Sequence, residues 1–160
     1  MPKALSLDRA TGDSMSNVDF EVRCRSSFGK QQFMSTLGAE LVRLEPGEVI
    51  IELPFSSQLT QQHGFLHAGA VASIVDSACG YAALSLMPEN TAVLTVEFKI
   101  NLIKPAAGTR FRATGKVLKA GRTLSVCSGS VEAHDGARWS LIALMQATMM
   151  SVPDRDDVKD

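Results

Sequence analysis

An apolar segment between His67 and Met87 is the most continuous hydrophobic stretch of the chain, and its pattern predicts a helix that Pro88 ends. Apolar side chains fall on every side of this helix and leave no polar stripe wide enough to face water. Such a helix is normally buried, so the other elements are expected to wrap around it. Asp76 lies in its middle. A carboxylate there must be neutralised, paired or lining a cavity, which makes Asp76 the first candidate for chemistry.

Shorter patterns on both sides of this helix predict a second helix and an antiparallel sheet. Residues 18–37 predict a helix that is interrupted near residues 26–29 and ends at Gly38. A Pro46-Gly47 turn joins two short strand patterns. Further strand patterns occupy residues 92–103, 109–118, 123–133 and 138–150. Strands that are grouped after a helix and joined by tight turns indicate an α+β fold, in which the apolar face of an antiparallel sheet covers the buried helix.

The strand pattern at residues 92–103 alternates cleanly between apolar and polar positions. Its apolar positions are Leu94, Val96, Phe98, Ile100 and Leu102. Its polar positions are Thr95, Glu97, Lys99 and Asn101. We predict that the apolar face enters the core, and that the polar face meets either water or a second subunit.

The composition is that of one globular domain, with 45% hydrophobic and 21% charged residues among 160. We expect this domain at residues 17–151, between a flexible segment (1–16) and a charged tail (152–160). The net charge of −1 argues against an electrostatically driven nucleic-acid partner. We expect neither a signal peptide nor a membrane span, because no apolar run is long enough. Cys24, Cys79 and Cys127 are scattered, which favours a reducing, cytoplasmic location.

Several residues recur in the order and spacing of a known enzyme family. They are Gln61, Gly64, His67-Ala68-Gly69, Asp76, Thr95, Pro105 and Lys119-Ala120-Gly121-Arg122-Thr123. With the predicted element order they resemble the hotdog-fold acyl-CoA thioesterases of the phenylacetate-degradation and 4-hydroxybenzoyl-CoA type, over residues 20–150. The resemblance implies a sheet wrapped around a long central helix and hydrolysis of an acyl-CoA to free acid and coenzyme A. It implies no cofactor beyond the coenzyme A of the substrate, and a homo-oligomer, either a dimer through the hotdog interface or a dimer of dimers.

The resemblance also implies roles for individual residues. The backbone N–H of Ala68, assisted by Gly69, polarises the thioester carbonyl at the start of the helix. The family has a glycine in place of Ala68, but a backbone donor survives the change. Asp76 acts as general base on water or as nucleophile, and the sequence does not separate these roles. Gln61 helps to place the water, and Thr95 assists. The implied coenzyme A contacts are Lys104, Lys119, Gly121, Arg122 and Thr123.

The spacing of two of these residues predicts a shared active site. Ala68 and Asp76 are eight residues apart, which is about 12 Å along one helix. An oxyanion donor and a general base must both lie within about 3 Å of one small reacting group. We therefore predict that Ala68, Gly69 and Gln61 of one subunit act with Asp76 and Thr95 of its partner.

Plainer roles remain open for the same residues. Asp76 can be a structural carboxylate bonded to backbone or to a neighbouring serine, and Gln61 can satisfy backbone groups of its loop. His67 is favoured as a helix-start residue over a catalytic base. His63 and His67 have the four-residue spacing of metal ligands on a helix. Gly64 argues against a helix there and no third ligand is convincing, so we expect no metal.

For the whole protein, a non-catalytic binder of acyl-CoA or of a small aromatic molecule is the alternative to a thioesterase. A hydratase of the same fold is disfavoured, because no histidine lies between His67 and His134. The acyl group that binds depends on how several large side chains pack, among them Phe65, Tyr81, Leu84 and Met87.

Overall fold

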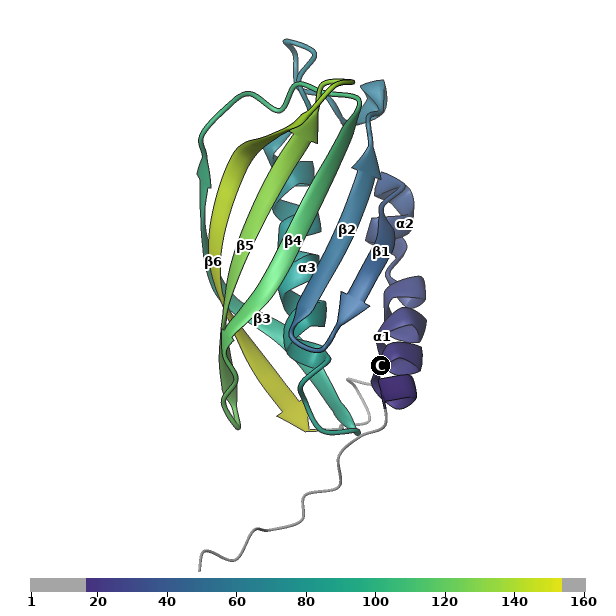
Figure 1. Ribbon diagram of the computed structural model, residues 1–160, viewed down its shortest axis with the longest axis vertical. Coiled ribbons are helices and arrows are strands. Elements are labelled where there is room, and N and C mark those ends of the chain that lie inside the picture. Colours follow the sequence, from purple (N-terminus) through teal and green to yellow (C-terminus); the bar gives the residue numbers. More distant parts are fainter. Residues whose placement is uncertain (1–16, 154–160) are drawn as a thin grey trace, which may run out of the picture.

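One antiparallel sheet curls around a central helix in the computed structural model, which describes residues 17–153 (Figure 1). The helices are α1 (Asn17–Lys30), α2 (Gln32–Leu37) and α3 (Ala68–Leu84), with a 3-10 turn, η1, at Ser57–Leu59. The strands are β1 (Glu40–Glu45), β2 (Glu48–Pro54), β3 (Thr91–Leu102), β4 (Arg110–Lys119), β5 (Leu124–His134) and β6 (Trp139–Pro153). Their order in the sheet is β1-β2-β4-β5-β6-β3, with every pair antiparallel. The predicted α+β fold is confirmed.

The predicted terminal segments lie almost entirely outside the described residues. The segment 1–16 is not among them. Of the predicted tail 152–160, only Val152 and Pro153 are described, and they end β6.

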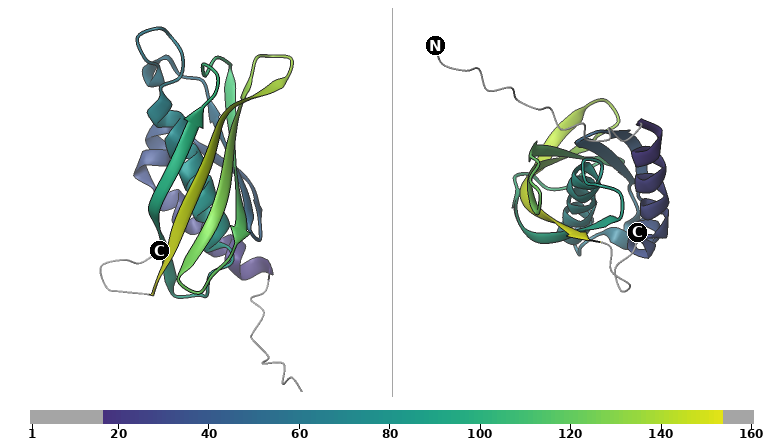
Figure 2. Two further views of the ribbon diagram at one scale, coloured as in Figure 1. Left: turned by 90° about the vertical axis from the view of Figure 1, so that its left-hand side faces the viewer. Right: turned by 90° about the horizontal axis from the view of Figure 1, so that it is seen from below.

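α3 lies in the concave side of the curled sheet, as the end-on view in Figure 2 shows. Two glycines allow the helix to approach the strands closely. A Cβ atom on Gly115 of β4 would lie 2.3 Å from the carbonyl carbon of Ala78, and one on Gly129 of β5 would lie 2.5 Å from Cγ2 of Val75. Only glycine fits where a helix backbone and a strand come this close. The helix therefore rests directly on the backbone of the two central strands.

The C-terminal end of α3 is held by α1. The guanidinium group of Arg23 donates hydrogen bonds to the carbonyl oxygens of Leu84, Met87 (3.0 Å) and Pro88 (2.6 Å). Carbonyl groups at a helix C-terminus lack partners within the helix, and a cation there also complements the helix dipole. The N–H of Gly47 in the β1–β2 turn donates to Ser85 Oγ at 2.8 Å and ties the sheet to the same end.

The predicted interruption of the first helix is misplaced. Residues 26–29 belong to α1, and the break between α1 and α2 is at Gln31, which has an extended backbone (φ −74°, ψ 95°). Serine and glycine favour a break in sequence terms, but Ser27 is buried and its hydroxyl lies 3.2 Å from the hydroxyl of Tyr81. This packing against α3 keeps the helix continuous to Lys30. α2 ends at Gly38 as predicted, in the left-handed conformation.

The prediction for the strand at residues 92–103 is partly wrong. The register between β3 and β6 shifts between Thr95 and Glu97, so Val96 is an extra, bulged residue. The bulge reverses the alternation, because Thr95 pairs with buried Met149 whereas Phe98 pairs with buried Ala147. Thr95 and Phe98 therefore face the same, concave side of the sheet.

Most of the apolar positions that we predicted as core are exposed on this edge strand. The exposed fractions are 46% for Leu94, 54% for Val96, 46% for Phe98 and 51% for Leu102. Ile100 alone is half-buried and packs against the core. The reason is that β3 is the last strand of the sheet, and no described element of the chain covers it beyond its first residues.

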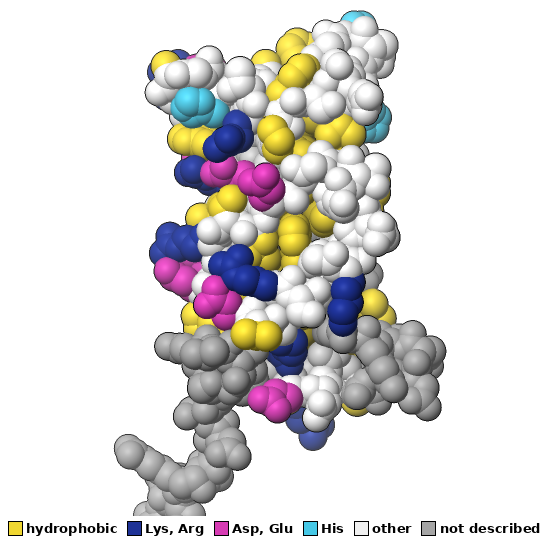
Figure 3. Space-filling view, turned by 90° about the vertical axis from the view of Figure 1, so that its right-hand side faces the viewer, with side chains coloured by type: hydrophobic (Ala, Val, Ile, Leu, Met, Phe, Trp, Pro, Cys, Tyr) yellow, Lys and Arg dark blue, Asp and Glu magenta, His cyan; other side chains and the backbone are white. Residues whose placement is uncertain are grey.

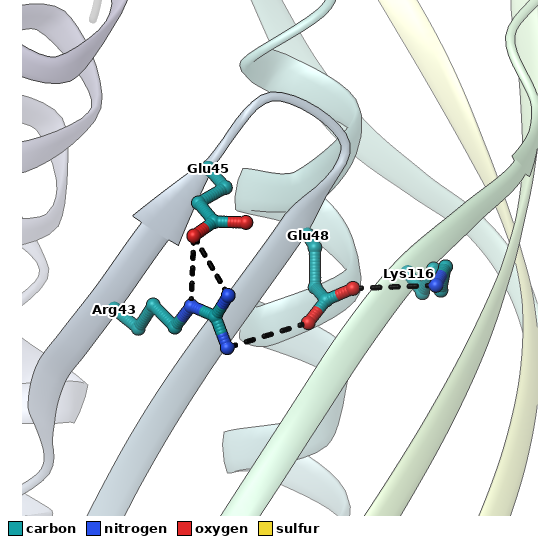
Figure 4. Close-up of polar contacts among 4 residues, drawn as sticks. All are labelled: Arg43, Glu45, Glu48 and Lys116. Atoms are coloured by element: carbon teal, nitrogen blue, oxygen red, sulfur yellow. Dashed lines mark hydrogen bonds and ion pairs between the residues drawn. The ribbon is translucent and has the colours of Figure 1, made fainter.

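The other edge of the sheet carries linked ion pairs. Arg43 on β1 contacts Glu45 at 2.7 Å and Glu48 at 4.0 Å, and Glu48 contacts Lys116 on β4 at 3.3 Å (Figure 4). In Figure 3, basic and acidic side chains alternate along this side of the molecule. Exposed pairs of this kind stabilise a fold by at most about 1 kcal/mol each. Charges on an edge strand also discourage pairing with a foreign sheet, so we assign this edge a structural role.

The cysteines are buried, as the sequence predicts for Cys79 and Cys127. Burial raises the pKa of the Cys127 thiol to about 11 and that of Cys79 further still, so neither supplies a thiolate nucleophile at neutral pH. None of the helices within residues 17–153 is both long and apolar enough to cross a bilayer.

The close approach of α3 to β4 yields a test of the fold. Substitution of Gly115→Ala places a Cβ against the Ala78 backbone, 2.3 Å away, and neither backbone can yield cheaply. We expect the free energy of unfolding to fall by about 3 kcal/mol or more in urea titrations. Gly29→Ala is the matched control, since a Cβ at this position of α1 meets nothing within 4 Å. It should be neutral or slightly stabilising, and equal effects of the two substitutions would contradict this account.

Candidate active site

One side of α3 stays uncovered within the chain. Val75, Ala78 and Cys79 face the sheet and are fully buried. The opposite side is exposed or half-buried, and we call it the open stripe of α3. It consists of Ala68, Gly69, Ala72, Ser73, Asp76 and Ser77. Residues at this spacing share one face of a helix. Ala68, the predicted oxyanion donor, and Asp76, the predicted base or nucleophile, therefore lie along the same stripe.

Asp76 lies in a cavity of about 260 Å³, which we call the Asp76 cavity. Its walls are formed by Ser27, Lys30, Gln31, Asp76, Ser77, Gly80, Tyr81, Val93 and Thr95. The hydroxyl of Thr95 donates a hydrogen bond of 2.9 Å to Asp76 Oδ1. The predicted association of these two residues is thus present within one chain. This contact depends on the β3 bulge, because Thr95 comes directly before the extra residue Val96 and faces α3 there.

The protonation of Asp76 reflects this setting. Burial raises the pKa of the carboxyl group, because a low-polarity environment disfavours its charged form, and the hydrogen bond from Thr95 offsets part of the rise. None of the ion pairs among the described residues involves Asp76. A half-buried carboxylate with a raised pKa, no cationic partner and a cavity in front of it has the properties of a general base or nucleophile.

At the start of α3 the backbone leaves one donor for a ligand. His67 is the N-cap residue, and its Nδ1 atom accepts a hydrogen bond of 2.9 Å from the N–H of Gly69. In the structural role favoured for it, His67 therefore caps the start of α3 with its side chain. The N–H of Ala68, the first helical residue, donates no hydrogen bond to any residue of the described chain. Since the dipole of α3 adds positive potential at this position, the Ala68 N–H has the properties of an oxyanion donor.

Gln61 lies in the tight loop that precedes α3. Its side-chain oxygen accepts a hydrogen bond from the N–H of His63, and its backbone bonds with Gly64 and Phe65 close the loop. Gly64 has a φ of 84°, which glycine adopts without strain. The side-chain oxygen of Gln61 thus has a structural contact, and its side-chain N–H₂ group is the part left to meet a ligand.

A second cavity, of about 480 Å³, begins at Ala68, and we call it the Ala68 cavity. Its walls are mostly apolar. They are Gln61, Phe65, Leu66, Ala68, Val71, Leu102, Ile103, Lys104, Pro105, Ala106 and Ile142. Ala68 and Gln61, two residues of the predicted half-site, are therefore brought together with Lys104, a predicted coenzyme A contact. Asp76 and Thr95 are not among them.

The other residues predicted to contact coenzyme A lie away from the Ala68 cavity, toward the opposite end of α3. Lys119, Gly121, Arg122 and Thr123 are exposed in the β4–β5 hairpin. This hairpin is near the C-terminal end of α3, because Val117 bonds with Gly47, whose turn contacts Ser85. A Cβ on Gly121 would lie 2.2 Å from the carbonyl oxygen of Leu124, which gives the glycine a structural reason of its own.

Sequence reasoning missed the contribution of α1. Ser27, Lys30 and Gln31 line the Asp76 cavity, and the only signal for them was the break in the first helix. Of the side chains expected to bound the acyl group, Tyr81 lines this cavity and Phe65 the other. Leu84 and Met87 lie in the core instead. Within residues 17–153 no three His, Cys, Asp or Glu side chains cluster as metal ligands would.

Comparisons with known proteins identify the family to which the chain belongs. Residues 63–140 match the family model of the thioesterase superfamily, a segment that contains α3 and Thr95. The chain is 34% identical to acyl-coenzyme A thioesterase 13 from Homo sapiens over 104 residues, which cover 64% of this chain and 72% of that protein.

Two solved structures show the same fold. A thioesterase family protein from Silicibacter pomeroyi is 49% identical, with a TM-score of 0.83 over 84% of this chain and 98% of that one. The PaaI protein from the phenylacetic acid degradation operon of E. coli has a TM-score of 0.77 over 86% of this chain and 96% of that one. At 18% identity, the latter is evidence for the fold alone.

The raised pKa of Asp76 predicts a stability change for Asp76→Asn. The folded chain binds the proton more tightly than the unfolded chain, so ionisation of Asp76 costs stability as the pH rises above 3.8 and through the folded pKa. Asparagine keeps an acceptor for Thr95 but carries no charge. We expect Asp76→Asn to raise the free energy of unfolding at pH 7 by roughly 1 kcal/mol. In urea titrations at fixed protein concentration, the gain should shrink toward pH 3.8; an unchanged or lowered value at pH 7 would contradict it.

Proposed function

This chain belongs to the thioesterase superfamily and is a thioester hydrolase, and on that premise we propose that it hydrolyses an acyl-CoA at a site shared between two copies of the chain. One observation carries the proposal. The unpartnered N–H of Ala68 and the carboxylate of Asp76 lie on the same open stripe of α3 but in different cavities. At eight residues' separation they are about 12 Å apart along the helix axis, too far to act on one carbonyl group.

Pairing of two β3 edges would bring the two half-sites together. The outer edge of β3 has no neighbour in the sheet, and apolar side chains at its end are exposed. Antiparallel pairing of this edge with a second copy would satisfy its backbone groups and cover those side chains. It would also place the open stripes of two α3 helices side by side in opposite directions. Ala68 of one copy would then approach Asp76 of the other.

The chemistry follows from the two groups. The Ala68 N–H and the helix dipole stabilise the negative charge that develops on the thioester oxygen. Asp76 either removes a proton from the attacking water or attacks the carbonyl carbon itself, with water then hydrolysing the anhydride. In both routes the C–S bond breaks, the thiolate of coenzyme A takes up a proton, and the acyl group leaves as the acid. Thr95 holds Asp76 in position through its hydrogen bond.

Exposed cations near the two ends of α3 support a coenzyme A binding role. Lys104 lies at the Ala68 cavity, and Lys119 and Arg122 lie in the β4–β5 hairpin at the other end. In the antiparallel dimer, the hairpin of one copy would lie near Lys104 of the other. Three cations around the mouth of one site suit the phosphates of coenzyme A.

The buried thiols of Cys79 and Cys127 support the predicted cytoplasmic location, since that compartment is reducing.

Removal of either group should slow thioester hydrolysis severely. Ala68→Pro replaces the N–H by a ring carbon and keeps the helix, because proline is accommodated at the first helical position and His67 already has a compatible backbone (φ −63°, ψ 139°). We expect kcat to fall by about a hundredfold to a thousandfold for Ala68→Pro and by about a hundredfold to ten-thousandfold for Asp76→Asn. Thiol release from short, medium, long-chain and aryl-CoA esters is the measurement.

Asp135→Asn is the control for the loss of a carboxylate, since Asp135 lies in the exposed β5–β6 turn. It should leave kcat unchanged. If the wild-type protein releases no thiol from any ester but is stabilised by one, it is the non-catalytic binder instead.

A mixed dimer tests the shared site directly. In a dimer of one Ala68→Pro chain and one Asp76→Asn chain, one of the two sites combines both intact groups. Random mixing of equal amounts should restore about a quarter of the wild-type activity, because half of the dimers are mixed and each has one intact site. If both groups act within one chain, mixing restores nothing, and that result would overturn the shared site.

A further inference from the structure

The far wall of the Asp76 cavity comes from outside the segment that defines the family. The family model begins at residue 63, whereas Ser27, Lys30 and Gln31 belong to α1 and its junction with α2. The shared part of the chain thus supplies the catalytic groups, and a separate part closes the space next to them. A wall with this origin is suited to select among substrates.

We infer that Gln31 selects acyl groups that carry an oxygen acceptor, a hydroxyl or a carboxylate, a few carbons from the thioester. This inference rests on the proposed acyl-CoA hydrolysis. Asp76 must reach the thioester carbonyl, so whatever fills the rest of its cavity is attached to that carbonyl. Coenzyme A is far too large for about 260 Å³. The acyl group is therefore the occupant.

The side chain of Gln31 is available for this role because it does not cap α2. Gln31 is the N-cap residue of α2, yet it makes no side-chain capping bond. Its Oε1 atom instead accepts a hydrogen bond of 3.4 Å from the hydroxyl of Ser77, the neighbour of Asp76. Among the described residues, its amide N–H₂ group has no acceptor. A side chain held beside the cavity by one atom thus offers two donors with the other.

The rest of the lining agrees with a polar occupant. Val93 is the only aliphatic side chain in the wall, and Lys30 adds a second donor beside Gln31. The cavity volume corresponds to about eight or nine waters at roughly 30 Å³ each, so an acyl group with a similar number of non-hydrogen atoms has room in it. A plain alkyl chain would displace water from the half-buried amide N–H₂ group of Gln31 without replacing its hydrogen bonds, at a cost in affinity.

The test compares three five-carbon esters that differ only in the acceptor: pentanoyl-CoA, 3-hydroxypentanoyl-CoA and glutaryl-CoA. We expect the wild-type kcat/KM for the hydroxy or the carboxylate ester to exceed that for pentanoyl-CoA by about tenfold. Gln31→Met, which keeps the length of the side chain, should reduce this ratio to about twofold or less. Gln32→Met is the matched control, because Gln32 has the same side chain at the next position and is exposed on α2.

Each outcome bears on the inference. A ratio near one in the wild-type protein, a preference for pentanoyl-CoA, or an equal change in the Gln31 and Gln32 variants would overturn it, while hydrolysis of the esters would leave the proposed function standing. If no ester releases thiol, the proposed function fails. The same comparison is then made on the increase in Tm that each ester produces, and loss of the polar preference in Gln31→Met alone would support the inference for binding.

Discussion

The structure depends on how closely α3 rests on β4 and β5. Gly115 and Gly129 remove the side chains that would hold the helix away from the sheet, so the backbone of Ala78 meets the strand directly. This contact decides the rotation of the helix about its axis. Val75, Ala78 and Cys79 are pressed against the sheet, and the side that carries Asp76 must then turn away from it. The half-burial of Asp76 and its raised pKa follow from that rotation.

The β3 bulge completes the setting of Asp76. Without the extra residue at Val96, a strand that presents Thr95 to α3 would turn Phe98 to the convex side. With it, one strand both hydrogen-bonds the carboxylate and keeps its later apolar side chains on the concave side. Two of these side chains, Phe98 and Leu102, remain exposed in the single chain. The same strand therefore both positions the Asp76 carboxylate and leaves apolar side chains exposed at its edge.

The features that the sequence could predict were those with a strong local pattern. The buried helix, the isolated carboxylate Asp76 and the Pro46-Gly47 hairpin were all found, because periodicity and turn chemistry determine them. The association of Thr95 with Asp76 came from a resemblance. The bulge at Val96 was missed, since a cleanly alternating strand carries no sign of an inserted residue. The break at Gln31 was misplaced, because the packing of Ser27 against Tyr81 outweighs the weak helix propensity of residues 26–29. Contacts that are distant in sequence decided both cases.

Arg23 has a consequence for how such an enzyme can change. Its guanidinium group ties α1 to the end of α3 through three carbonyl oxygens, and backbone carbonyls are present whatever the side chains are. This part of the attachment of α1 is therefore insensitive to the side chains of α3, and it involves neither Lys30 nor Gln31. Selection can replace Lys30 or Gln31 without loosening the helix that presents them. The N-terminal segment is in this sense an exchangeable cover, which can be redesigned or swapped between relatives while the hydrolytic machinery beneath it stays the same.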